Sequence, residues 1–218
     1  MKKLIGLILL SCLSLLPSPA SPSKPFSPWK TPAQKATRPV APQDGDLIFQ
    51  HSRSPLSRAI QLATRSPYSH CGLIYRRRGA VFVLEAIQPV SLTPLKDWIK
   101  RGKNGHYVLM RLKDSSKVLT PEIWQKMKIL GDSFVGKDYD GSFEWSDERI
   151  YCSELIWKIY QRATGLEIGQ LKRLKEFDLS SPLVKKQLAQ RYGNKIPLNE
   201  WVISPAAMLH SPLLTKVE

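Results

Sequence analysis

Cys152 is placed where a cysteine can act as a nucleophile. It stands in the segment Tyr151-Cys152-Ser153-Glu154-Leu155, and the apolar residues that follow recur at helical spacing, so we expect it at the amino end of an amphipathic helix. The unpaired N–H groups and the dipole of a helix start favour a thiolate. The backbone amides of Cys152 and Ser153 would form an oxyanion hole there. The alternative interpretation is a buried structural cysteine.

His70 is the candidate general base. It begins an apolar run, residues 70–75, and a second run covers residues 80–86. The residues between them, Arg76-Arg77-Arg78-Gly79, are typical of a β-hairpin, with Gly79 supplying the unusual backbone angles of the turn. A histidine on such a strand could accept the proton of a cysteine nucleophile.

The register of this hairpin decides the role of Glu85. A two-residue turn centred on Arg77 and Arg78 puts Glu85 directly opposite His70 on the same face, where its carboxylate would orient the imidazole as the third member of a triad. A three-residue turn with Gly79 as a bulge would point Glu85 away. The sequence leaves both registers open.

Cys71 also has two interpretations. In the favoured register it faces away from His70 and belongs to the core. In an oxidising compartment it could instead form a disulfide with Cys152. A metal site is not favoured, because the chain has no Cys-x-x-Cys, no His-Glu-x-x-His, and too few ordered carboxylates at residues 136–141 for a calcium loop. We therefore predict neither a metal nor a cofactor.

The amino-terminal region predicts export. Lys2 and Lys3 precede an apolar stretch too short to span a bilayer, which indicates a signal peptide over residues 1–20 with cleavage after Ala20. A lipoprotein signal with acylation at Cys12 is the competing interpretation. Six prolines and four basic residues make residues 21–43 an extended linker. The protein would then be periplasmic or attached to the cell envelope.

The composition is that of a globular protein with 218 residues, 42% of them apolar and 23% charged. The formal net charge is +15, and loss of Lys2 and Lys3 with the signal would leave +13. Such a chain could associate with anionic lipids or acidic wall polymers, although a basic surface can also serve solubility alone. Export and the lack of a recognition motif argue against nucleic acid. We expect a monomer.

The order of predicted elements indicates one α+β domain over residues 44–218. Strands are expected near residues 47–49, 68–75, 80–86, 106–112 and 201–203. Helices are expected over residues 57–64, 121–135, 152–164 and 182–192, the second capped by Thr120 and the last two ended by Gly165 and Gly193. A short amphipathic turn or helix is expected over residues 94–100. This mixture favours an antiparallel sheet or barrel packed against helices.

Several segments resemble one family. They are Gly45-Asp46-Leu47-Ile48-Phe49-Gln50, Ser69-His70, Leu84-Glu85-Ala86, Gly136-Lys137-Asp138-Tyr139-Asp140, Tyr151-Cys152-Ser153-Glu154-Leu155 and the tail 175–182. Together they resemble the YiiX type of permuted papain-like amidases, within the NlpC-type superfamily of cell-wall peptidases, over essentially residues 44–215. The resemblance implies a circularly permuted papain-like fold with Cys152 as nucleophile, His70 as base and Glu85 as the polar third member. Asp138 departs from the proline common in relatives.

The expected function is therefore an exported cysteine hydrolase that cleaves amide bonds through an acyl-enzyme. The favoured substrate is a peptidoglycan stem peptide or a related cell-envelope amide. One rival hypothesis is an envelope lipid hydrolase or acyltransferase with the same three residues, as the resemblance to permuted relatives implies. The other is a binding module without catalysis. Fold alone does not choose among substrates.

Overall fold

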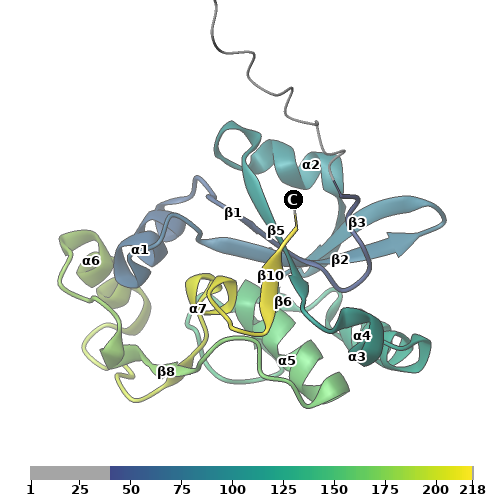
Figure 1. Cartoon of the computed structure of the whole chain (residues 1–218). Coiled ribbons are helices and arrows are strands. Elements are labelled where there is room, and N and C mark those ends of the chain that lie inside the picture. The colour runs from purple at the N-terminus through teal and green to yellow at the C-terminus, as the bar shows by residue number, and fades with distance from the viewer. Residues whose placement is uncertain (1–39, 218) are drawn as a thin grey trace, which may run out of the picture. The chain divides into compact units, whose positions relative to one another are not determined.

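A computed structural model describes residues 40–217 and shows an α+β domain built on one antiparallel sheet (Figure 1). The sheet has six strands in the order β10 (Leu214–Lys216), β5 (Tyr107–Leu112), β1 (Leu47–Gln50), β2 (His70–Arg77), β3 (Ala80–Glu85) and β4 (Ser91–Pro94). Two short ribbons accompany it: β6 (Asp138–Tyr139) runs parallel to β7 (Arg149–Ile150), and β8 (Lys172–Arg173) antiparallel to β9 (Trp201–Val202).

The helices are α1 (Pro55–Thr64), α2 (Leu95–Arg101), α3 (Ser115–Val118), α4 (Pro121–Phe134), α5 (Cys152–Thr164), α6 (Pro182–Tyr192) and α7 (Pro205–Leu209), with 3₁₀ turns at Lys103–Gly105 and Leu174–Glu176. The helix ends follow the sequence signals. Thr120 accepts a hydrogen bond from the amide of Ile123 at the start of α4, and Gly165 ends α5 with φ at +80°. The predicted α+β class and most of the element types are thus confirmed.

The two faces of the sheet bury different sets of side chains. Cys71, Leu73 and Tyr75 of β2 belong to the large core that includes helices α4 and α5. Alternate residues, among them Ile74, lie on the opposite face with Trp98 of α2. The period of two along β2 therefore places His70 on the α2 face and Cys71 on the α5 face. Helices α2 and α5 lie on opposite sides of the sheet in Figure 1.

The register of the β2–β3 hairpin differs from the favoured prediction. Arg77 pairs with Ala80, so the two turn residues are Arg78 and Gly79 and not Arg77 and Arg78. Both have positive φ, 50° and 80°, which is the requirement of the turn type preferred by two-residue hairpins. Gly79 adopts this conformation without steric cost, and that fixes the turn one residue further along.

The observed register keeps Glu85 on the face of His70. The last pair of β2 with β3 is Leu73 with Leu84, so Glu85 comes opposite Gly72 and not opposite His70. Residues 70 and 72 share a face, and Glu85 is therefore the diagonal neighbour of His70, still within reach of a long side chain. Gly72 leaves room on this face, since a Cβ there would lie 2.1 Å from Cγ1 of Val83 and 3.6 Å from Cβ of Glu85.

The amino-terminal edge of the described region already packs on the sheet. Arg111 of β5 donates to both carboxylate oxygens of Asp46, at 2.7 and 2.8 Å, and to the carbonyl of Ala41 at 3.3 Å. The predicted signal peptide, Cys12 and most of the predicted linker lie outside the described residues. Within residues 40–217, no helix has the length and apolar character needed to cross a membrane.

Gly72→Ala should destabilise the fold, because the added methyl overlaps Val83 and forces β2 and β3 apart. Overpacking of this kind costs about 1–3 kcal/mol, which urea unfolding would measure. Gly141→Ala is the matched control, since its φ is not positive and its nearest atom, Nε of Arg191, lies at 3.8 Å. Equal stabilities of the two variants would contradict the packing at Gly72.

Candidate active site

The start of helix α5 is anchored on both sides of Cys152. Tyr151 has extended backbone angles and its carbonyl accepts from the amide of Leu155 at 3.0 Å, so the helical hydrogen bonds begin only after Cys152, Ser153 and Glu154. The hydroxyl of Ser153 donates to the carbonyl of Ile203 at 2.9 Å, and the amide of Ile203 donates to the hydroxyl of Tyr151 at 3.1 Å. These contacts fix a nearly buried Cys152, 3% exposed.

His70 and Glu85 form a direct contact. Nε2 of His70 lies 2.6 Å from Oε2 of Glu85, whose side chain has no solvent exposure. The second carboxylate oxygen, Oε1, accepts from the hydroxyl of Thr93 at 2.5 Å and from the guanidinium of Arg101. Burial alone would raise the pKa of Glu85, but the hydrogen bonds and charges of His70, Thr93 and Arg101 lower it. Glu85 is therefore an ionised carboxylate.

The indole of Trp98 supports the other side of the imidazole. The ring centroids of His70 and Trp98 are 6.0 Å apart with an interplanar angle of 25°. Trp98 comes from α2 and is fully buried. The imidazole thus has one nitrogen held by Glu85 and one face held by the indole, which leaves Nδ1 for the thiol.

The surroundings of Cys152 favour its ionised form, the thiolate. The pKa of Cys152 lies well below its ordinary value because the thiol of Cys71 donates a hydrogen bond to it; burial opposes the shift, and a hydrogen bond and the charge of His70 add to it. The backbone amide of Cys71 is a further donor to Cys152. Burial also lowers the pKa of His70, but Cys152 and Glu85 outweigh it and raise that pKa to about 9. A thiolate–imidazolium pair follows.

Cys71 contributes a donor and not a second nucleophile. Burial, followed by the neighbouring Cys152, raises its pKa well above the ordinary value, and both cysteines are free thiols. The backbone amide of Cys71 can donate to Cys152 because the pairing of β2 with β3 ends at Leu73 and Leu84, before it reaches Cys71. The interpretation of Cys71 as a core residue holds, but its contact with Cys152 was not foreseen.

Two pockets meet at this site and differ in character. One is apolar, has a volume of about 700 Å³ with its open mouth, and is lined by Cys152 together with Tyr139, Phe143 and side chains of α1 and α6. The other adjoins His70 and is lined by polar side chains, namely Gln50, several serines, Gln88 and Arg101, together with apolar ones such as Leu56, Ile60 and Ile87. Cys152 therefore borders an apolar pocket, and His70 borders a more polar one, which we call the polar pocket.

The structure brings together the three residues that the sequence singled out, and adds others. Thr93, Arg101 and Trp98 were missed. Thr93 lies on β4, which was not predicted as a strand, and its diagonal position toward Glu85 follows only from that pairing. A turn or helix over residues 94–100 was expected; the structure has a helix that extends to Arg101, and no local pattern shows which face of the sheet it covers.

Comparison with known proteins gives the family of the chain. Residues 41–218 match the family described as permuted papain-like amidase enzyme, YaeF/YiiX, C92 family. The chain belongs to this family of cysteine amidases. Its fold is accordingly the circularly permuted papain-like one, in which the strand with His70 precedes the helix with Cys152.

Two relatives of the C92 family cover most of the chain. The protein YiiX of Escherichia coli (strain K12) is 51% identical over 176 residues, which are 81% of this chain and 86% of that protein. A crystal structure of YiiX from Escherichia coli O157:H7, described as a metalloprotein, aligns with a TM-score of 0.77 and 51% identity over 81% of this chain and 97% of that one. The resemblance seen in the sequence is thus confirmed.

The ionisation state of the site predicts how alkylation depends on pH. Because the pKa of Cys152 is low, iodoacetamide should react with one thiol at a rate that stays nearly constant below pH 8, where an ordinary thiol is mostly protonated. Cys71→Ala removes the largest stabilisation of the thiolate and should move the inflection to higher pH. Peptide mapping of the labelled protein gives the site, and preferential labelling of Cys71 would contradict the assignment.

Proposed function

We propose that this amidase hydrolyses an amide that joins an apolar acyl group to a polar amine, with Cys152 as nucleophile, His70 as general acid and base, and Glu85 orienting His70. The observation that carries this proposal is the continuous polar row from Glu85 through His70 to a Cys152 with lowered pKa. The charge needed for attack on a carbonyl is already present on the sulfur of Cys152.

The proposed reaction proceeds in two stages. The thiolate of Cys152 attacks the amide carbon, and the tetrahedral intermediate collapses when the imidazolium of His70 gives its proton to the leaving amine. His70, now neutral, takes a proton from water, which attacks the thioester and releases the acid. Glu85 stays ionised and stabilises the imidazolium at each stage where it forms.

The oxyanion is assigned to the start of α5. The amides of Cys152 and Ser153 precede the first helical hydrogen bond and point out of the helix start, where the dipole is positive. The hydroxyl of Ser153 is held by Ile203, which leaves the amide as the group of Ser153 that can serve the substrate.

The two pockets support the assignment of the substrate's two halves. His70 protonates the leaving amine, so the amine belongs in the polar pocket that His70 lines. The acyl group stays on Cys152 and belongs in the apolar pocket that Cys152 lines. An acyl chain gains about 0.8 kcal/mol for each methylene that it buries in such a pocket.

The stem peptide of peptidoglycan is the substrate that the sequence favoured, and it agrees less well with an apolar acyl pocket. A stem peptide would place polar or charged atoms where the walls are side chains of leucine, valine, alanine and phenylalanine. Hydrolysis of a lipid ester by the same three residues remains consistent with both pockets.

The description of one relative as a metalloprotein does not carry over to the residues described in this chain. Within residues 40–217, no group of three or more histidine, cysteine, aspartate and glutamate side chains is arranged to hold a metal ion. Nε2 of His70 is already engaged by Glu85. No step of the proposed reaction passes through a metal.

We also propose that the protein acts outside the cytoplasm, as the basic, apolar and proline-rich order of the first 43 residues indicates. The positive charge would keep it near anionic lipids or wall polymers. Intact-mass analysis of the protein purified from the envelope separates cleavage after Ala20 from acylation at Cys12.

Removal of the nucleophile should abolish turnover. Cys152→Ala is expected to lose hydrolysis by at least about 10³-fold together with covalent labelling, because it removes the thiolate that forms the acyl-enzyme. The measurement is release of free amine from N-acyl amino acids, muropeptides and phospholipids assayed in parallel, with fatty acid release as the readout for the last. Hydrolysis retained by the variant would defeat the proposal.

The apolar pocket predicts a dependence on chain length. For amides of one amine with acyl chains of increasing length, kcat/KM should rise by up to about fourfold per methylene until the pocket is full. Ala59→Leu narrows the α1 wall and should shorten the optimal chain while sparing an acetyl amide. A flat dependence on length, or faster cleavage of muropeptides, would assign the substrate differently.

A further inference from the structure

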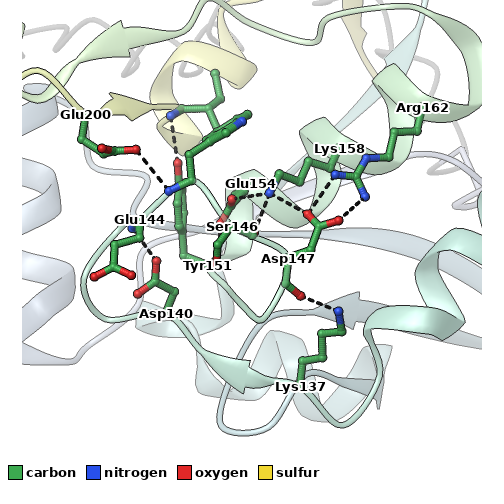
Figure 2. Close-up of polar contacts among 12 residues, drawn as sticks. Lys137, Asp140, Glu144, Ser146, Asp147, Tyr151, Glu154, Lys158, Arg162 and Glu200 are labelled. Carbon is green, nitrogen blue, oxygen red and sulfur yellow. Dashed lines mark hydrogen bonds and ion pairs between the residues drawn. The ribbon is translucent and has the colours of Figure 1, made fainter.

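A partly buried charged cluster joins α5 to the segment before β7 and is not used by the proposed chemistry (Figure 2). The side chain of Lys158 is 4% exposed, and its ammonium lies 2.7 Å from Oε1 of Glu154, 2.9 Å from Oδ1 of Asp147 and 2.6 Å from the carbonyl oxygen of Ser146. Ser146 and Asp147 accept hydrogen bonds from the ammonium, and Glu154 is its ion-pair partner on the same helix. The ring of Trp145 lies 4.9 Å from the same nitrogen.

The cluster fastens the segment between β6 and β7, residues 140–148, to α5. Glu154, Lys158 and Arg162 are spaced by four and so form one stripe on the helix. Arg162 donates to both carboxylate oxygens of Asp147, at 2.7 and 2.8 Å. Lys137 donates to the backbone carbonyl of Asp147. We call residues 140–148 the wall loop.

The other end of the wall loop has its own contacts. The carboxylate of Asp140 accepts from the amides of Ser142 and Glu144, at 2.7 and 2.5 Å. Nε of Arg191 donates to the carbonyl of Gly141 at 2.5 Å. The wall loop is therefore held near Asp140 by local bonds and by Arg191, and at Asp147 by the charged cluster. Between these ends, Tyr192 donates to the carbonyl of Ser142 and the amide of Trp145 donates to Glu200 at 3.3 Å.

The residues between these two ends face the substrate cleft. Phe143 lines the apolar pocket beside Cys152 and packs edge-on against Tyr151, with centroids 5.2 Å apart. Gly141 lines the polar pocket next to His70. One loop thus borders both pockets, and a change in its conformation alters both halves of the cleft.

Stability does not explain why the cluster is charged. Removing Lys158 and Glu154 from water is costly, and burial raises the pKa of Glu154 to about 8 even though Lys158 opposes that shift. Apolar residues of similar volume often replace such a pair with equal or greater stability. What they cannot provide is the set of directional bonds from Lys158 to Asp147 and Ser146.

We propose that Lys158 is a positioning residue: by joining Glu154 of the catalytic helix to Asp147 and Ser146, it sets the conformation of the wall loop and thereby the shape of the substrate cleft beside Cys152. The effect on substrate binding rests on the proposed function. The effect on the loop does not.

The test is the double variant Glu154→Leu/Lys158→Met, which removes the buried carboxyl group and the buried ammonium and keeps the volume. We expect a melting temperature equal to or above that of the wild type, faster hydrogen–deuterium exchange of the amides of residues 140–148, and about a tenfold rise in KM for an N-acyl amino acid with little change in kcat. Alkylation of Cys152 by iodoacetamide should stay within twofold, because this small reagent does not use the cleft wall.

Two single variants complete the experiment. Asp147→Asn weakens the same contacts from a half-exposed position and should change exchange and KM in the same direction. It decides the question if the double variant does not fold. Glu144→Gln is the matched control, since it breaks only the exposed ion pair of the same loop with Arg149 and should change neither quantity.

Unchanged exchange in the wall loop and unchanged KM in the double variant and in Asp147→Asn would overturn the proposal. A large loss of melting temperature in the double variant would overturn it as well, because the pair would then serve stability. If the wild type cleaves no acyl amide, the proposed substrate is wrong, while hydrogen exchange still tests the role of Lys158 in the loop.

Discussion

The charge of Glu85, held without solvent, is the constraint on which the arrangement of this site depends. A buried carboxylate is strongly unfavourable unless donors surround it. Three elements supply those donors, since His70 comes from β2, Thr93 from β4 and Arg101 from α2. The same contacts that satisfy the carboxylate therefore fix the imidazole and align two strands with a helix. Cys152 then meets an imidazole whose position and charge are already set.

The site also depends on the two faces of one strand. His70 and Cys71 are neighbours in β2, yet they belong to opposite faces. Because β2 runs past the start of α5 beyond the end of its pairing with β3, the imidazole of His70, the thiol of Cys71 and its amide all reach Cys152. Two adjacent residues at the start of β2, His70 and Cys71, thus both contact the sulfur of Cys152.

The sequence predicted the fold class and the helix that begins at Cys152, because each rests on a local pattern. The helix start at Cys152 follows from apolar periodicity, whereas the face of Glu85 depends on a hairpin register that the sequence left open. The turn was misplaced by one residue, because the pattern of apolar residues does not show that Arg78 adopts a positive φ beside Gly79. The sequence could not predict the contacts of Thr93, Arg101 and Lys158, because tertiary packing determines their partners.

The comparisons place the chain in a family of cysteine amidases, and the two pockets give that chemistry a direction. Cys152 borders apolar walls and His70 borders more polar ones, and the proposed amide has its acyl side toward α1 and α6. In the proposed reaction, this orientation places the leaving amine beside His70. The wall loop, held by Lys158, borders both sides and couples their shapes.

The most direct test of this account is the protonation state of His70 in the resting enzyme, measured by ¹⁵N NMR of the imidazole as a function of pH. We expect both ring nitrogens to carry protons at neutral pH, with deprotonation near pH 9 and a fall of the pKa of His70 toward an ordinary value in Cys152→Ala. A neutral imidazole at pH 7 that titrates below 6.5, unaffected by the loss of the sulfur, would contradict it.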